Sequence, residues 1–221
     1  MEHVQERLSR KDRERLIRRR EILSAAQEVI AEKGYNEATL EEIAARAEYG
    51  KGTLYNYFPG GKQEILLSIF GQFYDELCLL IAGTFPKKDP APFKIQLHTF
   101  FEKTFDFFFE RLDLFVTLLR EAHRLGFSDD AGPRKFFESQ RTRALAALSA
   151  PLERAMQHGE IRRSSPRFLA HMILVNINGC QMKACGGPSP TDIESPDTAK
   201  EMADFLTSLV YDGLKNDGAM A

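Results

Sequence analysis

The sequence predicts an all-α protein, with a small N-terminal domain of three helices followed by a larger helical domain. Apolar residues recur at helical spacing through most of the 221 residues. No stretch alternates with the period of two that is typical of strands. Residues that start or stop helices divide the chain into about nine helical segments. We expect an N-terminal extension at residues 1–17, the small domain at residues 18–62 and the larger domain at residues 63–221.

The composition is that of a soluble globular protein, but the charge is unevenly distributed. Apolar residues make up 43%, charged residues 28%, and the formal net charge is −2. This balance argues against a protein that coats nucleic acid along its whole length. Residues 1–20 nevertheless hold eight Arg or Lys against four Asp or Glu. The extension is either a solvated tail or a basic arm that reaches phosphates or the minor groove through Arg10, Lys11, Arg13 and Arg18 to Arg20.

The first clear helix covers residues 19–33. Its inner stripe is apolar and Gly34 ends it; the stripe consists of Ile22, Ala26, Val29 and Ile30. A second helix follows Thr39, because the Thr39 hydroxyl can accept a backbone N–H of the first turn and Glu42 completes a capping box. One face of this second helix is apolar, with Leu40, Ile43, Ala44 and Ala47.

A tight turn and a third short helix come next. Glu48-Tyr49-Gly50 interrupts the apolar pattern, and residues 51–58 start a helix with Leu54 and Phe58 turned inward. Lys51, Thr53, Tyr55 and Asn56 then remain for a contact outside the domain. Two short helices joined in this way are typical of a helix-turn-helix, whose second helix enters the major groove of DNA.

The motif Thr39-Leu40-x-x-Ile43-Ala44-x-x-Ala47, followed by Lys51-Gly52-Thr53-Leu54-Tyr55-x-Tyr57-Phe58, resembles the DNA-binding domain of the TetR (tetracycline repressor) family. The resemblance covers residues 18–70. Two departures are visible. Tyr49-Gly50 replaces the family's small aliphatic residue and Ser or Thr, so the recognition helix lacks its usual side-chain cap. An extra glycine at Gly60-Gly61 moves Lys62 one position further from Phe58.

The resemblance implies a set of DNA-binding residues, and side-chain chemistry agrees with it. A glycine near the start of the recognition helix permits close approach, while Thr and Asn side chains can touch base edges. Tyr and Lys side chains would anchor the phosphate backbone. The expected DNA-binding residues are Thr39, Arg46, Lys51, Gly52, Thr53, Tyr55, Asn56, Tyr57 and Lys62.

The larger domain is expected to bind a small molecule, because the family pattern places a ligand pocket there. Seven Phe lie between residues 100 and 115, and a pocket with such walls suits an apolar or aromatic ligand. Core packing is the other interpretation for each ring. The expected ligand-binding residues are His98, Phe101, Phe105, Phe108, Leu118, His123 and Asn178, with Asn176 and Gln181 as further polar points.

The last two helices are expected to form a homodimer, again because the resemblance implies it. Ser165-Pro166 and Ser195-Pro196 both look like helix starts, with Ser as N-cap and Pro at the first helical position. The alternative is that the apolar faces of these helices close a monomer core. The residues expected to face the partner are Phe168, Met172, Val175, Gly179, Met202, Phe205, Leu206, Leu209 and Gly213.

Other classes of function find little support in the sequence. Gly50-Lys51-Gly52-Thr53 lacks the spacer of a phosphate-binding loop, and the five His are scattered without metal-ligand spacing. We therefore expect no enzymatic activity, no metal and no cofactor. Cys78, Cys180 and Cys185 fit buried reduced thiols, with a Cys180/Cys185 redox switch as the alternative. We see no signal peptide and no apolar run long enough for a membrane, which predicts a cytoplasmic protein.

These observations together predict a regulator of transcription, most simply a repressor. It would bind a palindromic operator in double-stranded DNA as a homodimer and release it when a small lipophilic effector binds. The alternative function is that of an architectural DNA-binding dimer that does not respond to a small molecule.

Overall fold

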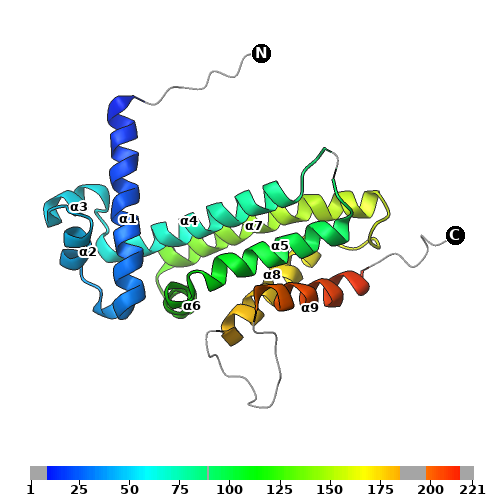
Figure 1. The fold of residues 1–221 in the computed structure, drawn as a ribbon. Helices are drawn as coiled ribbons and strands as arrows, with labels where there is room; N and C mark the ends of the chain where they lie inside the picture. The colour runs from blue at the N-terminus through cyan, green and yellow to red at the C-terminus, as the bar shows by residue number, and fades with distance from the viewer. Residues whose placement is uncertain (1–8, 89, 185–197, 215–221) are drawn as a thin grey trace. The chain divides into compact units, whose positions relative to one another are not determined.

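The computed structural model describes residues 9–88, 90–184 and 198–214, and over these residues it contains nine helices and no strand (Figure 1). The prediction of an all-α protein is confirmed. The chain divides into two compact units, Met1–Phe70 and Gly71–Ala221, each with its own internal contacts. This division falls within a helix and lies later in the chain than the predicted boundary at residue 62.

The first unit contains α1 (Arg10–Glu37), α2 (Leu40–Arg46), α3 (Lys51–Tyr57) and the beginning of α4 (Gly61–Thr84). Helix α1 begins well before the predicted residue 19, because the Ser9 hydroxyl accepts a hydrogen bond from the Asp12 backbone N–H and caps it. Gly34 breaks the helical conformation with a φ of 81°. A glycine is suited to this position, because side chains make a positive φ unfavourable.

The core of the first unit consists of the apolar side chains that the helical spacing in the sequence predicts to be buried. Every residue of the predicted inner stripe of α1 is buried, and Ile43, Leu54 and Phe58 are fully buried as well. The capping box at the start of α2 is confirmed. The Thr39 hydroxyl accepts from the Glu42 N–H at 3.2 Å, and the Glu42 carboxylate accepts from the Thr39 N–H at 3.1 Å. Local capping and a small apolar core therefore define this unit.

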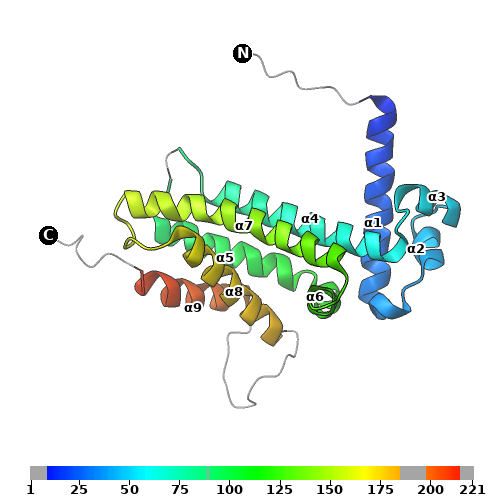
Figure 2. The ribbon, with the colours of Figure 1, turned by 180° about the vertical axis from the view of Figure 1, so that it is seen from behind.

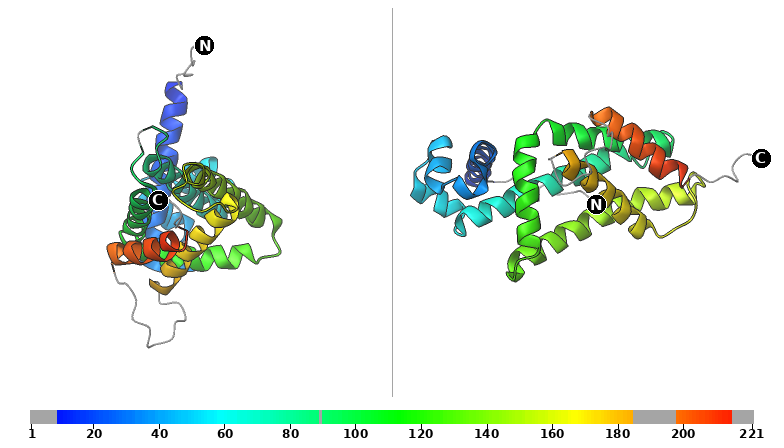
Figure 3. Two further views of the ribbon diagram at one scale, coloured as in Figure 1. Left: turned by 90° about the vertical axis from the view of Figure 1, so that its right-hand side faces the viewer. Right: turned by 90° about the horizontal axis from the view of Figure 1, so that it is seen from below.

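The second unit contains the rest of α4 and five further helices. These are α5 (Phe93–Phe109), α6 (Leu112–Gly126), α7 (Ala131–Gln157), α8 (Pro166–Ala184) and α9 (Ala199–Asp212). Helix α5 packs mainly on α9, and α7 packs mainly on α8. Figure 2 shows α4 and α7 side by side, and Figure 3 shows α6 running across the direction of α5 and α7, which it connects.

The structure defines the starts of α6 and α9. The Phe-rich stretch ends at Phe109, and a separate helix starts at Leu112, so Asp113 lies in the first turn of α6. Helix α9 begins after Thr198, whose hydroxyl caps it in a second capping box with Glu201. The start predicted at Ser195-Pro196 lies outside the described residues. By contrast, α8 starts as predicted, with the Ser165 hydroxyl accepting from the Phe168 N–H at 3.3 Å.

Helix α4 is long and apolar enough to cross a membrane by length and composition alone, contrary to the expectation that no such run exists. It is the one helix of this kind in the described part of the chain. Core helices of soluble proteins meet the same criteria. Ile65, Leu66 and Ile69 are fully buried inside the first unit, so this apolar stretch has a packing role.

Candidate nucleic-acid interface

Helix α3 presents a polar face that the domain itself does not use. Leu54 and Phe58 are fully buried beneath it, whereas Lys51, Tyr55 and Asn56 are exposed and Thr53 is half-buried. Within the part of the chain that the structure describes, neither Thr53 nor Asn56 makes a side-chain hydrogen bond. The Gly50 N-cap provides no side-chain hydrogen bond either, as the sequence predicts. The start of α3 therefore offers free donors and acceptors to an external partner.

The two glycines at the start of α3 are not required by the fold. Neither Gly50 nor Gly52 has a positive φ, and a Cβ atom added to either would meet nothing within 4 Å. Gly61 differs, since its φ of 63° disfavours a side chain whatever the space. The bare backbone at Gly50 and Gly52 thus leaves room for close approach by a molecule outside the domain.

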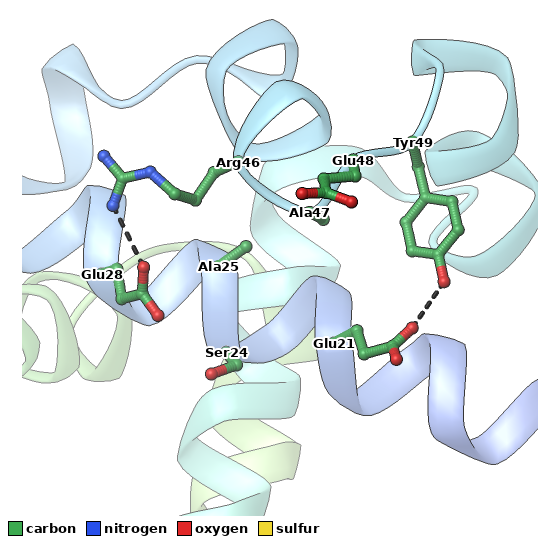
Figure 4. A pocket seen from close by; sticks show the side chains of 8 residues that line it. All are labelled: Glu21, Ser24, Ala25, Glu28, Arg46, Ala47, Glu48 and Tyr49. Carbon is green, nitrogen blue, oxygen red and sulfur yellow. Dashed lines mark hydrogen bonds and ion pairs between the residues drawn. The ribbon is translucent and has the colours of Figure 1, made fainter.

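The turn before α3 is fastened to α1. The Tyr49 hydroxyl donates a hydrogen bond to the Glu21 carboxylate, which raises the pKa of the Tyr49 phenol (Figure 4). Glu48 adopts a φ of 60° in the same turn. A shallow groove of about 410 Å³ lies between α1 and this turn, with Glu21, Glu28 and Arg46 among its lining residues. Tyr49 thus positions the turn before α3, whereas the sequence analysis noted it only as a departure from the family motif.

Lys51 is paired with an acidic residue on the preceding helix. Its ammonium group contacts the Glu41 carboxylate, and this contact raises the pKa of Lys51 and lowers the pKa of Glu41. Both side chains are at least half exposed. Lys51, the cationic residue of α3, is therefore partly neutralised in the free protein by Glu41, which the sequence analysis did not select.

Arg46 and Lys62, both predicted to contact DNA, make contacts within the domain in this structure. Arg46 forms ion pairs with Glu28 at 3.1 Å and Glu32 at 2.8 Å, and the Glu32 hydrogen bonds raise its pKa most. The Lys62 ammonium donates to the backbone carbonyls of Tyr35, Asn36 and Ala38 at 2.8, 3.0 and 2.9 Å. An ammonium has three donors, so none remains for a phosphate. In this structure Lys62 instead caps carbonyls at the end of α1.

Two arginines of α1 lie beside the end of α3. The Arg19 guanidinium donates to the Tyr57 carbonyl at 3.3 Å and to the Ser68 hydroxyl at 2.8 Å, and it stacks over the Phe58 ring. The Arg15 guanidinium lies 5.9 Å from the centre of the Tyr57 ring. Tyr57 itself is half-buried. Arg19 is thus internal to the domain, whereas Arg15 lies at the border of the polar face.

The residues predicted to bind a ligand do not converge on one cavity in the described structure. Phe101 and Phe105 are fully buried in the main core of the second unit, and Phe108 and Leu118 are buried as well. His98 contacts the Asp204 carboxylate of α9 at 2.8 Å. The two remaining predicted residues, His123 and Asn178, are exposed; His123 stacks on Phe127 at 4.8 Å. The aromatic residues are therefore core residues here, and the polar ones point to separate places.

A different set of polar groups lies between α4 and α7. The Gln140 side-chain carbonyl is buried and accepts no hydrogen bond from any described residue. Residues one turn before and one turn after Gln140 contact α4. Phe136 lies near Gly71, and Arg143 forms an ion pair with Asp75 at 2.6 Å. A buried carbonyl without a donor is unfavourable, so this position could orient a polar group of a ligand. The sequence pattern gave no sign of it.

The predicted dimer residues divide into two groups. Phe168, Met172, Val175, Phe205 and Leu209 are large apolar side chains that the described structure leaves exposed, and Gly179 and Gly213 are exposed with them. Met202 and Leu206 instead lie in the core of the unit, only 4% and 1% exposed. Their side chains point away from the exposed face, because they lie on the side of α9 that packs on α5. The candidate surface therefore consists of the first group only.

These features define a helix-turn-helix protein: α2 is capped, a tight turn follows it, and α3 has a free polar face. Comparisons with known proteins narrow this class. Residues 22–69 match the family model of bacterial regulatory proteins of the tetR family. Two curated relatives come from Bacillus subtilis: the uncharacterized HTH-type transcriptional regulator YuxN, 37% identical over 68 residues, and the fatty acid metabolism regulator protein, 43% identical over 61 residues.

These two matches are short. They cover 31% and 26% of this chain, and 23% and 31% of the respective relatives. A structural similarity extends over nearly the whole chain. SmeT, the repressor of the Stenotrophomonas maltophilia multidrug efflux pump SmeDEF, aligns with a TM-score of 0.68 and 22% identity over 92% of this chain and 93% of SmeT. The SmeT–triclosan complex gives a TM-score of 0.69. The match to the tetR family model therefore covers residues 22–69, and the solved structures show a shared fold over nearly the whole chain.

Proposed function

We propose that this protein regulates transcription, most simply as a repressor that binds a palindromic operator as a homodimer and releases it on binding a small apolar or aromatic effector. The observation that carries the proposal is the exposed polar face of α3 on an independent, well-packed unit. Lys51, Thr53 and Asn56 would meet base edges, and Tyr55 would anchor the phosphate backbone.

The proposal of a homodimer follows from the size of the recognition element. Helix α3 covers seven residues and can read only a few base pairs, so a second copy related by a twofold axis supplies the affinity. The exposed apolar side chains on α8 and α9 support this proposal, since large apolar patches mark interaction surfaces. Phe168 on α8 and Phe205 on α9 would be central, because both rings are more than half exposed.

The effector would act by changing which arrangement of the two subunits is populated. In one arrangement the two α3 helices match successive major grooves, about 34–36 Å apart, and in the other they do not. The SmeT–triclosan complex suggests a compact aromatic molecule as one class of effector. The buried Gln140 carbonyl would be the polar contact for the effector in the second unit. A protein with this function would act in the cytoplasm.

The DNA site is tested by Lys51→Ala and Tyr55→Ala together in the full chain. The operator is first selected from a random pool of duplexes with the wild-type protein. The double variant is expected to lose at least about tenfold in operator affinity, because a base contact and a phosphate contact disappear. Lys103→Ala, an exposed change in the second unit, is the control. Unchanged binding by the double variant, with an unchanged circular dichroism spectrum, would refute the site.

The effector is tested by mass spectrometry of molecules that co-purify with the protein, followed by titration of the protein–operator complex with each molecule and with triclosan. The effector is expected to dissociate the complex, and Gln140→Leu is expected to weaken this response while leaving operator binding intact. If operator affinity stays constant throughout the titration, the protein fits the alternative function, an architectural dimer without a small-molecule response.

A further inference from the structure

The first turns of α1 project from the first unit without contributing to its core (Figure 1). Every residue from Ser9 to Arg18 is exposed, including the apolar Leu16 and Ile17. The first buried residue of α1 is Ile22. A short helical segment whose side chains lie outside the core is only marginally stable in water. These turns therefore do not stabilise the fold, and their residues are available for another role.

The positive charges on this segment divide between two faces. Lys11, Arg15 and Arg18 stand at i, i+4 and i+7, which places them in one row along the helix. This row, the inner row, continues into the buried Ile22 and so lies on the side of α1 that faces α2 and α3. Three other arginines lie off this face and are called the outer row. Arg13 and Arg20 stand on the opposite side, and Arg10 lies on the flank, paired with Glu14 at 2.9 Å.

The inner row runs beside the recognition helix. The Arg15 guanidinium lies 5.9 Å from the centre of the Tyr57 ring, at the end of α3. One turn further along α1, the charge of Arg18 is felt by Tyr49, where it opposes the rise in the pKa of that phenol caused by the hydrogen bond to Glu21. The inner row thus borders α3 at Tyr57 and the turn before α3 at Tyr49. Neither Lys11 nor Arg18 has a side-chain hydrogen bond or ion pair among the described residues.

We propose that the inner row is a second DNA-binding element, which binds phosphates beside the major groove that α3 would read. This inference rests on the proposed DNA binding. Phosphates fit better than the minor groove does, because a helix with side chains is about 10–12 Å wide and the minor groove is about 6 Å wide. Charge complementarity selects DNA as the occupant. The element adds affinity that does not depend on sequence, since phosphate contacts carry no base information.

The experiment compares two triple variants that each remove three positive charges from the same helix. The inner-row variant is Lys11→Gln, Arg15→Gln and Arg18→Gln. The outer-row variant is Arg10→Gln, Arg13→Gln and Arg20→Gln. Operator affinity is measured at several salt concentrations. For the inner-row variant the slope of log K against log salt is expected to become shallower by about 5, because the dimer loses six phosphate contacts and each removes about 0.9. The outer-row variant is expected to keep the wild-type slope.

A second variant and a second measurement protect the test from effects on folding. Lys11→Gln with Arg18→Gln spares the contact between Arg15 and Tyr57, and its slope is expected to change by about 4, because the dimer loses four phosphate contacts. Amide hydrogen exchange across residues 10–18 is expected to slow on operator binding in the wild type, and less in the inner-row variant. Preference for the operator over random duplexes of equal length, measured at one salt concentration, should change little.

The possible failures are distinguishable. Equal slopes for the wild type and the inner-row variant, or equal losses in both triple variants, would overturn the inner row as a specific element while leaving the proposed function intact. If the wild-type protein selects no duplex, or if Lys51→Ala with Tyr55→Ala binds normally, the proposed site on α3 fails first. If no duplex is selected, the inner row is overturned together with the site on α3. If the double variant binds normally, a slope change confined to the inner-row variant supports the inner row but not the site on α3.

Discussion

The two units are stabilised by different chemistry. In the first, short helices are fixed by polar contacts such as the Thr39 capping box, the Arg46 ion pairs and the three carbonyl contacts of Lys62. In the second, long helices bury aromatic rings, with Phe100, Phe101 and Phe105 fully enclosed. The difference teaches that residue type alone does not assign a role to a cation in the first unit. There, cations of the same kind serve either the fold or the exposed face.

The largest expected effect concerns the aromatic core of the second unit. Phe101→Ala is expected to lower the free energy of unfolding of this unit by about 3–5 kcal/mol, because it removes a fully buried ring and leaves a cavity. Denaturant unfolding of the full chain measures the change. Phe127→Ala is the matched control, since that ring is 81% exposed, and it should change stability by less than about 0.5 kcal/mol. Similar losses in both variants would show that burial does not determine how much a ring contributes to the stability of this unit.

The second prediction separates two lysines of the first unit. Lys62→Met retains the apolar stem but removes three hydrogen bonds to carbonyls, so it is expected to destabilise this unit by about 1–2 kcal/mol. Lys51→Met is expected to leave stability nearly unchanged and to weaken operator binding. Thermal unfolding and DNA titration of both variants make the comparison. A stable Lys62→Met protein with impaired DNA binding would restore Lys62 as a phosphate contact.

The third prediction concerns the acidic partner of Lys51. Glu41→Gln removes the carboxylate that holds the Lys51 ammonium and a negative charge that would lie close to DNA phosphates. Operator affinity at low salt is therefore expected to rise roughly two- to fivefold, in keeping with the modest strength of exposed ion pairs. Glu14→Gln, which removes an exposed carboxylate paired with Arg10, is a control of equal charge. A fall in affinity with Glu41→Gln would show that Glu41 positions Lys51 instead of restraining it.

The sequence predicted those features that depend on neighbouring residues. The Thr39–Glu42 capping box and the uncapped start of α3 are confirmed, because both depend on residues within one helical turn. The same kind of box at Thr198 was missed, since Ser195-Pro196 offered an earlier start signal. The roles of Lys62 and Arg46 were hidden because their partners lie far away in the sequence. For Phe101 and Phe105 the sequence left two interpretations, a pocket wall and a packed core, and it could not tell them apart.

The smallest expected effect is the pH dependence of the α2 cap. The hydrogen bond from Lys33, together with those from Thr39, lowers the pKa of Glu42 from 4.5 to about 2. Between these values the unfolded chain binds a proton that the folded chain does not. The contribution of Glu42 is therefore fully present above about pH 4.5 and is lost as the pH falls toward about 2. Glu42→Gln keeps an acceptor for the Thr39 N–H but cannot ionise, so it should remove this component.

The measurement is the stability of the first unit in the wild type and in Glu42→Gln, taken between pH 2 and pH 6. The two curves are expected to converge toward pH 2, to separate as the pH rises from about 2 to about 4.5, and to stay apart above that, since only the wild type gains a charged cap. The separation should be small because the carboxylate is exposed and solvent screens it. Parallel curves would mean that the Glu42 carboxylate does not distinguish the folded from the unfolded chain. The polar contacts of the first unit would then owe their effect to geometry and not to charge.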